Sequence, residues 1–120
     1  MGEDAACRLI KAKGMEVLAR NYRCKKGEID IIARDGKIIC FVEVKTRSIS
    51  TKSRPGKGLT NKQKKRIYNA SKRYLKELDQ TEAICRYDLI ELRFDTYDFC
   101  EARYWPRHFS SHKIKALFSE

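Results

Sequence analysis

The sequence predicts an α/β domain in which a mixed β-sheet is flanked by helices. Three observations favour this class. The patterns along the chain follow the order helix, three strands, helix, two strands, as in domains whose sheet and helices share one core. The pair Asp35-Gly36 separates two runs rich in Ile and Val, which is typical of a β-hairpin. Thr60 is followed three positions later by Gln63, the spacing of a capping box at a helix start.

The first part of the chain predicts one helix and three strands. Apolar residues recur at helical spacing over residues 3–13, and Gly14 suits the end of that helix. A strand pattern follows over residues 15–24. Residues 28–34 and 37–46 are then the two arms of the predicted hairpin.

The second part predicts a loop, a long helix and two more strands. Residues 47–59 are polar and basic and have no periodicity, so we expect a flexible loop there. The helix that opens at Thr60 extends to about Asp79. Residues 85–94 and 97–105 alternate enough for two strands, and Pro106 is expected to end the second one. The tail is expected to be a loop with at most a short helix.

Size and charge restrict the function classes. A chain of 120 residues can bury one core but hardly two, so residues 1–120 are expected to form a single domain. The net charge of +11 attracts polyanions, which favours nucleic acid as the partner over anionic lipid surfaces. No apolar run approaches the roughly 20 residues of a membrane helix. Five cysteines without a CxxC pair indicate free thiols in the cytoplasm rather than a zinc site or disulfides.

The hairpin gathers charged side chains on one face. If Asp35-Gly36 is a two-residue loop, Asp30 lies opposite Phe41 and Glu28 lies opposite Glu43. Alternation then places Glu28, Asp30, Glu43 and Lys45 on the same face, with Asp30 and Glu43 as diagonal neighbours about 7 Å apart at their Cα atoms. The other face carries the apolar residues Ile29, Ile31, Val42 and Val44.

Acidic side chains crowded on one face repel one another unless a cation neutralises them. Oxygen ligands of this kind suit Mg²⁺ or Mn²⁺, which activate water and stabilise charge on a phosphodiester. Lys45 would contact the same phosphate or orient the water. The alternative is a solvated face with ordinary cross-strand ion pairs. Large apolar residues on the same face argue against that alternative: Ile32, Ile39 and Phe41.

The segments 27–30 (Gly-Glu-Ile-Asp) and 41–47 (Phe-Val-Glu-Val-Lys-Thr-Arg) resemble the PD-(D/E)xK nuclease signature. The chain looks most like the YraN family of small bacterial proteins, which is similar to archaeal Holliday junction resolvases. This resemblance implies a restriction-endonuclease-like fold and a metal-dependent endonuclease that hydrolyses phosphodiesters in branched or otherwise structured DNA. A homodimer would suit a junction-cutting enzyme, although no segment marks an interface.

The resemblance implies roles for individual residues. Asp30 and Glu43 are metal ligands, Lys45 is the catalytic cation, and Glu3 in the first helix completes the catalytic acids and the metal site. Glu28 is the alternative third acid because the predicted hairpin places it opposite Glu43. Glu3 has a second interpretation, as an acid that the helix macrodipole favours near an N-terminus. An aromatic-glycine pair common in relatives is missing from residues 48–58.

A basic segment follows the hairpin. Between Lys45 and Arg66 the chain has nine Lys or Arg residues and no acid. We expect contacts with the nucleic-acid backbone from Arg47, Lys62, Gln63, Lys65 and Arg66. The alternative is a solvated helix face, which is the interpretation for Lys72, Arg73 and Lys76. His108 and His112 are expected to be surface residues, in a tail whose segment 104–108 is a capping surface or an oligomer contact.

Two other functions compete with the nuclease. One is a nucleic-acid-binding module of the same fold that works through partners in recombination, repair or DNA uptake. The other is a basic structural protein of the ribosome or of a membrane surface. This last class accounts for the charge but leaves the acids of the hairpin unexplained.

Overall fold

The computed structural model describes residues 2–48, 58–95 and 98–118. Its helices and strands follow one another as α1 (Gly2–Ala12), β1 (Glu16–Cys24), β2 (Gly27–Asp35), β3 (Ile38–Ser48), α2 (Asn61–Glu77), β4 (Cys85–Phe94), β5 (Phe99–Phe109) and α3 (Ser111–Phe118). Of the predicted flexible loop, residues 49–57 lie outside the described residues.

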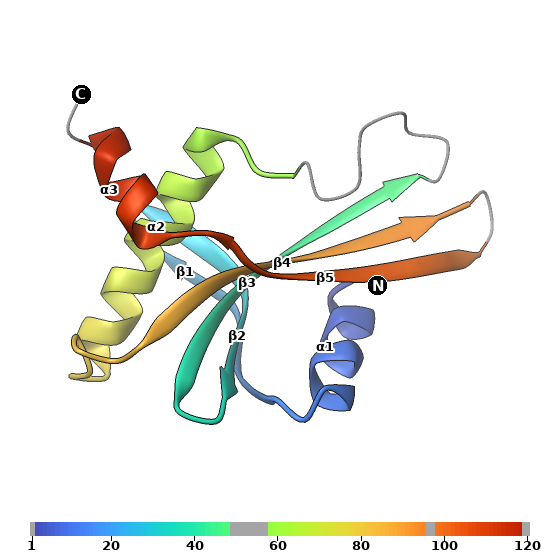
Figure 1. The fold of residues 1–120 in the computed structure, drawn as a ribbon, viewed down its shortest axis with the longest axis horizontal. Coiled ribbons are helices and arrows are strands. Elements are labelled where there is room, and N and C mark those ends of the chain that lie inside the picture. Colours follow the sequence, from blue (N-terminus) through green and yellow to red (C-terminus); the bar gives the residue numbers. More distant parts are fainter. Residues whose placement is uncertain (1, 49–57, 96–97, 119–120) are drawn as a thin grey trace.

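Within the described residues, the five strands form one sheet in the order β1-β2-β3-β4-β5. Neighbouring strands are antiparallel except β3 and β4, which are parallel and joined through α2. Figure 1 shows α1 on one side of the sheet and α2 with α3 on the other. The predicted mixed sheet flanked by helices is therefore confirmed.

Each face of the sheet has its own core. Under α1, the residues Ala6 and Ile10 pack against Ile31 and Val42 of the hairpin. The core under α2 contains an aromatic row in which Phe109 stacks on Tyr87 at 4.7 Å and Tyr87 on Phe41 at 5.6 Å between ring centroids. Because helices cover both faces, β4 is buried along most of its length, and β3 is buried over residues 39–42.

The hairpin register differs from the prediction by two residues. Asp35 pairs with Ile38 and Arg34 with Ile39, so the loop is Gly36-Lys37 instead of Asp35-Gly36. Gly36 has φ of 60°, a left-handed conformation that glycine adopts easily at the first position of a tight hairpin loop. A shift of two residues keeps every side chain on its face, since side chains alternate with a period of two.

One apolar residue of the hairpin lies on the other face from the one predicted. Ile29 belongs to the core under α2, whereas Ile31 belongs to the core under α1. The prediction that both share a face is therefore wrong. Regular pairing of β2 with β3 ends at Ile31 and Val42, and beyond that pair the side chain of Asp30 bonds to β3. β2 stays paired with β1 in this stretch, and Ile29 lies opposite Tyr22, which packs against the same core under α2.

The last strand is longer than predicted because Pro106 does not end it. β5 continues to Phe109, which pairs with Tyr87, while Trp105 pairs with Leu89. The register shifts between these two pairs, so Pro106 lies in an irregular stretch. β5 is also an edge strand, where a residue without a backbone N–H is tolerated. The short helix expected in the tail is α3.

The long helix begins as predicted. The Oγ1 of Thr60 accepts a hydrogen bond from the backbone N–H of Gln63 at 3.1 Å, and the Thr60 N–H donates to Oε1 of Gln63 at 2.8 Å. This is the complete capping box that the spacing indicated. Of the helices described, none has the length and apolar character needed to cross a membrane.

Gly27 is expected to be intolerant of any side chain. A Cβ atom there would lie 1.8 Å from the carbonyl oxygen of Arg66, so β2 and the backbone of α2 would have to separate. Gly27→Ala is expected to lower the free energy of unfolding by about 3 kcal/mol or more in a urea titration. Gly14→Ala is the control, because its φ of 82° costs about 1 kcal/mol in strain but nothing lies within 4 Å of the new Cβ. Equal losses in the two variants would contradict the close approach.

Candidate functional site

The structure brings Asp30 and Glu43 together where the pairing of β2 and β3 ends. The Oδ2 of Asp30 accepts a hydrogen bond from the backbone N–H of Val44 at 2.8 Å. This bond replaces a ladder bond and holds the Asp30 carboxylate over β3, next to Glu43. Both carboxylates are half-buried, and Asp30 is fixed by a backbone donor rather than by a mobile cation.

Glu43 is the acid of this site whose pKa is raised by its surroundings. Its Oε1 is buried and has no hydrogen-bond partner among the described residues. Burial, followed by the neighbouring carboxyl group of Asp30, raises the pKa of Glu43 to about 9. A buried oxygen without a donor beside a second carboxylate is an arrangement that a hard cation would stabilise. The donor set therefore fits Mg²⁺ or Mn²⁺.

Lys45 lies two residues after Glu43 on the same face of β3. Its Nζ donates a hydrogen bond to the carbonyl oxygen of Gly58, in the segment that leads into α2. Burial and the nearby charge of Arg47 lower the pKa of Lys45. The ammonium is therefore held close to the acid pair and retains donors that can reach a phosphate oxygen.

Neither proposed third acid joins the pair. Glu3 is in the first turn of α1, with its Oε2 3.9 Å from Nη2 of Arg20. Glu28 is half-exposed, and its Oε2 lies 3.5 Å from Nε of Arg23. Among the described residues, no three acidic, histidine or cysteine side chains are grouped closely enough to hold a metal ion. The third acid stays a prediction, with an arginine beside each of the two alternatives.

Residues 2–92 match the model of the uncharacterised protein family UPF0102. The chain belongs to this family. A UPF0102 protein of Chlorobaculum tepidum is 46% identical over 89 residues, which cover 74% of this chain and 69% of the relative. A UPF0102 protein of Pelotomaculum thermopropionicum is 38% identical over 95 residues, 79% of each chain.

The UPF0102 match contains the whole acid pair and Lys45, and it ends in β4. UPF0102 is the YraN family, so the family predicted from the sequence is confirmed. A third UPF0102 protein, from Clostridium kluyveri, is 40% identical over 98 residues, which cover 82% of this chain and 80% of the relative. β5 and α3 lie beyond the residues that the UPF0102 model matches.

Arg47 has an acidic partner that the sequence pattern did not predict. Glu91 is fully buried in β4, 3.6 Å from Nε of Arg47 and 3.2 Å from Nε of Arg93. Only 14% of the Arg47 side chain is exposed, so a contact with nucleic acid would compete with this ion pair. The only signal in the sequence is that Glu91 lies between Ile90 and Leu92, in a strand that also contains other charged residues.

The expected nucleic-acid contacts on α2 differ in their surroundings. Lys62 and Arg66 are exposed, whereas Lys65 is half-buried with its Nζ 5.4 Å from the centre of the Phe118 ring. The side chain of Gln63 is used in the capping box. Three further basic residues of the expected footprint lie outside the described residues: Lys52, Arg54 and Lys57.

A buried network, which the sequence also did not predict, anchors the end of β5. Asp88 is 1% exposed and accepts hydrogen bonds from Nε of Arg86 at 2.9 Å, from the Tyr104 hydroxyl, and from the backbone N–H of Arg107 at 3.0 Å. Arg107 has φ of 53°, so the last bond holds an unusual backbone conformation in place. His108, which follows, is half-buried rather than a plain surface residue, and burial lowers its pKa.

Glu43→Gln is expected to remove a pH dependence of stability. The pKa of Glu43 is higher in the folded than in the unfolded chain, so the folded state binds more protons between about pH 4.5 and pH 9. Stability without metal therefore falls as the pH rises through this range. At pH 8 we expect Glu43→Gln to be more stable than wild type by roughly 1–3 kcal/mol in thermal unfolding, with a small difference at pH 4.5.

Glu28→Gln is the control for this measurement, since Glu28 is half-exposed and ion-paired on the same hairpin. It is expected to change stability by less than about 0.5 kcal/mol at both pH values. Parallel pH profiles for wild type and Glu43→Gln would contradict the raised pKa. Added Mn²⁺ should stabilise wild type more at pH 8 than at pH 5, because metal binding requires the ionised carboxylate.

Proposed function

We propose that this chain is a Mg²⁺- or Mn²⁺-dependent endonuclease of the restriction-endonuclease-like fold, acting on branched or otherwise structured DNA. The observation that carries the proposal is the pairing of Asp30 with Glu43 where β2 and β3 diverge, with Lys45 next on the same face of β3. A carboxylate pair beside one ammonium is the chemistry that phosphodiester hydrolysis needs. The sheet with α1 on one face and α2 on the other is compatible with that fold.

Asp30 and Glu43 would hold the metal ion. When bound, the ion supplies positive charge to the scissile phosphate and lowers the pKa of water. The protein contributes orientation: the backbone N–H of Val44 fixes the Asp30 carboxylate, and burial around Glu43 makes an unneutralised charge costly. A cation would therefore both complete the site and relieve the repulsion between the two acids.

Lys45 would bind an oxygen of the scissile phosphate. Its ammonium is half-buried, where a charge–charge interaction is stronger than in water. The neighbouring exposed cations of α2, Lys62 and Arg66, would contact the backbone of the same strand without reading bases. The net charge of +11 supports a polyanionic substrate.

A second candidate is a nucleic-acid-binding module that keeps this fold but does not cleave. One observation favours it: within the part of the chain that the structure describes, the acid pair lacks a third ligand. Such a protein would work through partners in recombination, repair or DNA uptake.

Purified protein incubated with four-way junctions, flaps, duplex and single-stranded DNA separates the two candidates. Metal-dependent cleavage of at least one of these substrates, absent in EDTA, is the expected result. Binding to the same DNA without cleavage at any Mg²⁺ or Mn²⁺ concentration would overturn the nuclease and favour the binding module.

A further inference from the structure

A basic cavity lies at the start of α2, outside the acid pair. It has a volume of about 380 Å³ and is bordered by the first turn of α2, the end of β5 and α3. Its polar lining includes Lys64, His108 and Lys113 with the side-chain donors of Asn61 and Ser110. None of the nine described residues that line it is acidic.

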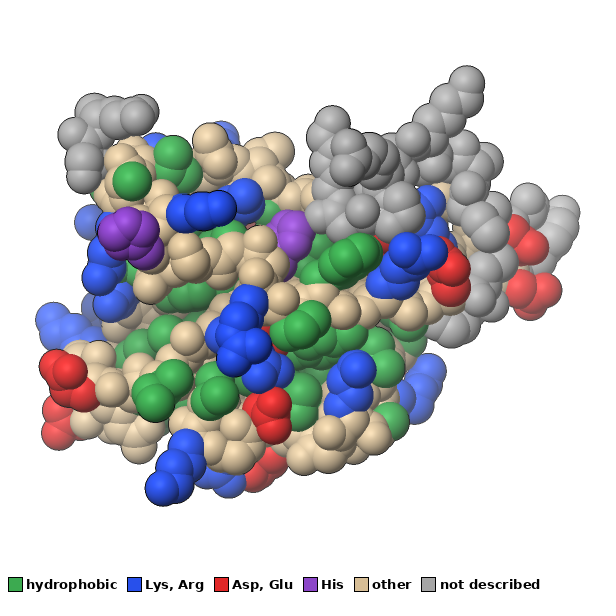
Figure 2. Space-filling model, viewed as in Figure 1, with side chains coloured by type: hydrophobic (Ala, Val, Ile, Leu, Met, Phe, Trp, Pro, Cys, Tyr) green, Lys and Arg blue, Asp and Glu red, His purple; other side chains and the backbone are tan. Residues whose placement is uncertain are grey.

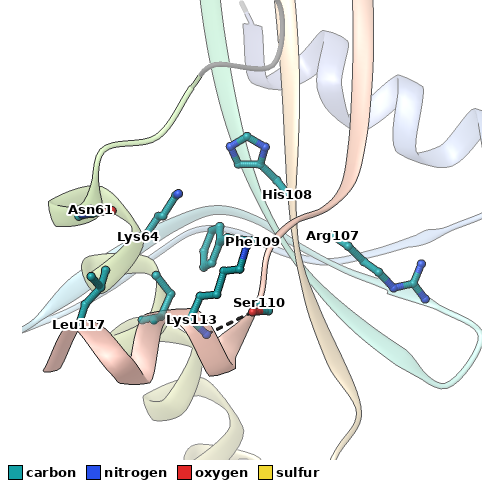
Figure 3. A pocket seen from close by; sticks show the side chains of 9 residues that line it. Asn61, Lys64, Arg107, His108, Phe109, Ser110, Lys113 and Leu117 are labelled. Atoms are coloured by element: carbon teal, nitrogen blue, oxygen red, sulfur yellow. Dashed lines mark hydrogen bonds between the residues drawn. The ribbon is translucent and has the colours of Figure 1, made fainter. Parts of the chain in front are cut away.

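Two lysines line this cavity. Figure 3 shows Lys64 from α2 and Lys113 from α3 on either side of the Phe109 ring, with His108 above them in this view and Arg107 directed away. The Nζ of Lys64 lies 5.8 Å from the centre of that ring. In the space-filling view, basic side chains lie between the two histidines on this face (Figure 2). Two ammonium groups that share one recess repel each other unless an anion lies between them.

These lysines differ from two arginines of β4, Arg86 and Arg93, which have carboxylate partners. Among the described residues, neither Lys64 nor Lys113 lies within ion-pair distance of an acid, whereas Arg86 and Arg93 do. The amides at the helix starts already have caps, since Ser110 Oγ accepts from the Lys113 N–H at 3.2 Å. An anion would therefore be held by side chains rather than by the helix ends.

The cavity opens on the same face of the sheet as the acid pair. The aromatic row connects the two, because Phe109 stacks on Tyr87, Tyr87 on Phe41, and Phe41 precedes Glu43 by two residues on β3. By strand geometry, Glu43 on β3 and Phe109 on β5 are separated by roughly 10 Å across the strands and roughly 7 Å along them. At about 3.4 Å of rise per nucleotide, a few nucleotides cover this distance.

We propose that the cavity formed by Lys64, His108 and Lys113 binds a phosphate group of the nucleic-acid strand that enters the acid site. This assignment rests on the proposed function, because that function supplies the nucleic acid. The chemical group recognised is a phosphate in every case, whether it is internal to a strand, at the end of a strand or free in solution. Lysine binds phosphate as a point charge, and His108 and Asn61 add donors of defined direction. The cavity would set the position of the strand a few nucleotides from the acid pair.

Lys64→Ala/Lys113→Ala tests the assignment by DNA binding, measured by fluorescence anisotropy in EDTA so that no cleavage occurs. The control is Lys72→Ala/Lys76→Ala, which removes the same charge from exposed positions of α2. Lys72 is closely matched, because its Nζ lies 5.4 Å from the centre of the Tyr68 ring, as Lys64 lies over Phe109. We expect the cavity variant to lose tenfold or more in affinity and the control less than threefold.

The salt dependence of binding gives a second readout that a general loss of charge would not reproduce. The magnitude of the slope of log K, where K is the association constant for DNA, against log salt concentration should decrease by about 2 in the cavity variant and by less than 1 in the control. Equal losses of affinity and slope in the two variants would overturn the proposal.

Inorganic phosphate provides a test on the unmodified protein. The chain has two histidines, so the imidazole NMR signals of His108 should move with phosphate while those of exposed His112 serve as the reference. Absence of any His108 shift at concentrations up to tens of millimolar, together with equal DNA affinities, would overturn the assignment. A His108 shift with unchanged DNA affinity would identify free phosphate as the ligand and overturn the link to the strand.

Oligonucleotides with and without a 5′-phosphate show whether the cavity binds a terminal or an internal phosphate of the strand. Tighter binding of the phosphorylated oligonucleotide, lost in Lys64→Ala/Lys113→Ala, would support a terminal phosphate, and equal binding of both would support an internal one.

The test is also independent of catalysis. If the cavity variant loses affinity while wild type cuts nothing, the cavity assignment holds and the nuclease proposal fails. If wild type cuts DNA while the cavity variant binds DNA as tightly as the control does, the nuclease proposal holds and the cavity assignment fails.

Discussion

Asp30→Asn is expected to lower metal-dependent cleavage by at least about 10²–10³-fold while leaving DNA binding within a few-fold of wild type. The substitution keeps the size of the side chain and an oxygen that can accept from the Val44 N–H, so the hairpin should remain intact. It removes the negative charge that would hold a cation beside Glu43. The loss should therefore appear in the cleavage rate at saturating DNA rather than in the affinity for DNA.

Asp79→Asn is the matched control, because it is the same chemical change at an exposed residue just after the end of α2. Its φ of 56° is one that asparagine also adopts readily. Cleavage by this variant should equal that of wild type. If Asp30→Asn cuts as fast as Asp79→Asn, any nuclease activity in the sample arises elsewhere and the acid pair is not catalytic.

Glu91→Ala is expected to lower the free energy of unfolding by about 3–5 kcal/mol. Glu91 is fully buried between Arg47 and Arg93, whose side chains are 14% and 7% exposed. Without the carboxylate, two guanidinium groups would share a poorly solvated space and repel each other. Urea denaturation measures the loss, and Glu91→Gln should recover part of it by restoring the hydrogen-bond acceptor.

Glu101→Ala provides the comparison for this cluster. Glu101 also pairs with Arg93, at 3.8 Å, but its side chain is 40% exposed, so its removal should cost less than about 1 kcal/mol. Similar losses in Glu91→Ala and Glu101→Ala would show that burial does not control the strength of this ion cluster. If Glu91→Ala left the free energy of unfolding unchanged, water would have to solvate the two arginines once the carboxylate is removed.

The sequence predicted the features that depend on local pattern. Alternation along β2 and β3 assigned Asp30, Glu43 and Lys45 to one face, and that face survives a register error of two residues because side chains repeat every two positions. The Thr60–Gln63 spacing predicted the helix start because a capping box involves only neighbouring residues.

Features that join distant segments required the tertiary structure. The hairpin loop is Gly36-Lys37, with Gly36 in a left-handed conformation, and Ile29 packs with Tyr22 of β1 in the core under α2. Local propensity does not reveal which of several compatible turns closes a hairpin, because packing on both faces selects among them.

The acid pair therefore follows from the sequence, whereas its surroundings do not. The partnership of Arg47 with Glu91 links β3 to β4, and the cavity that Lys64 and Lys113 line lies between α2 and α3. Basic residues that look alike in the sequence differ in how strongly they can interact with an added anion. The strength of that interaction depends on burial, which sets the local dielectric constant, and on the distance to an acidic partner. The sequence alone predicted the residues that we propose for the chemistry, and the fold decided which of the described cations lie beside an acid and which do not.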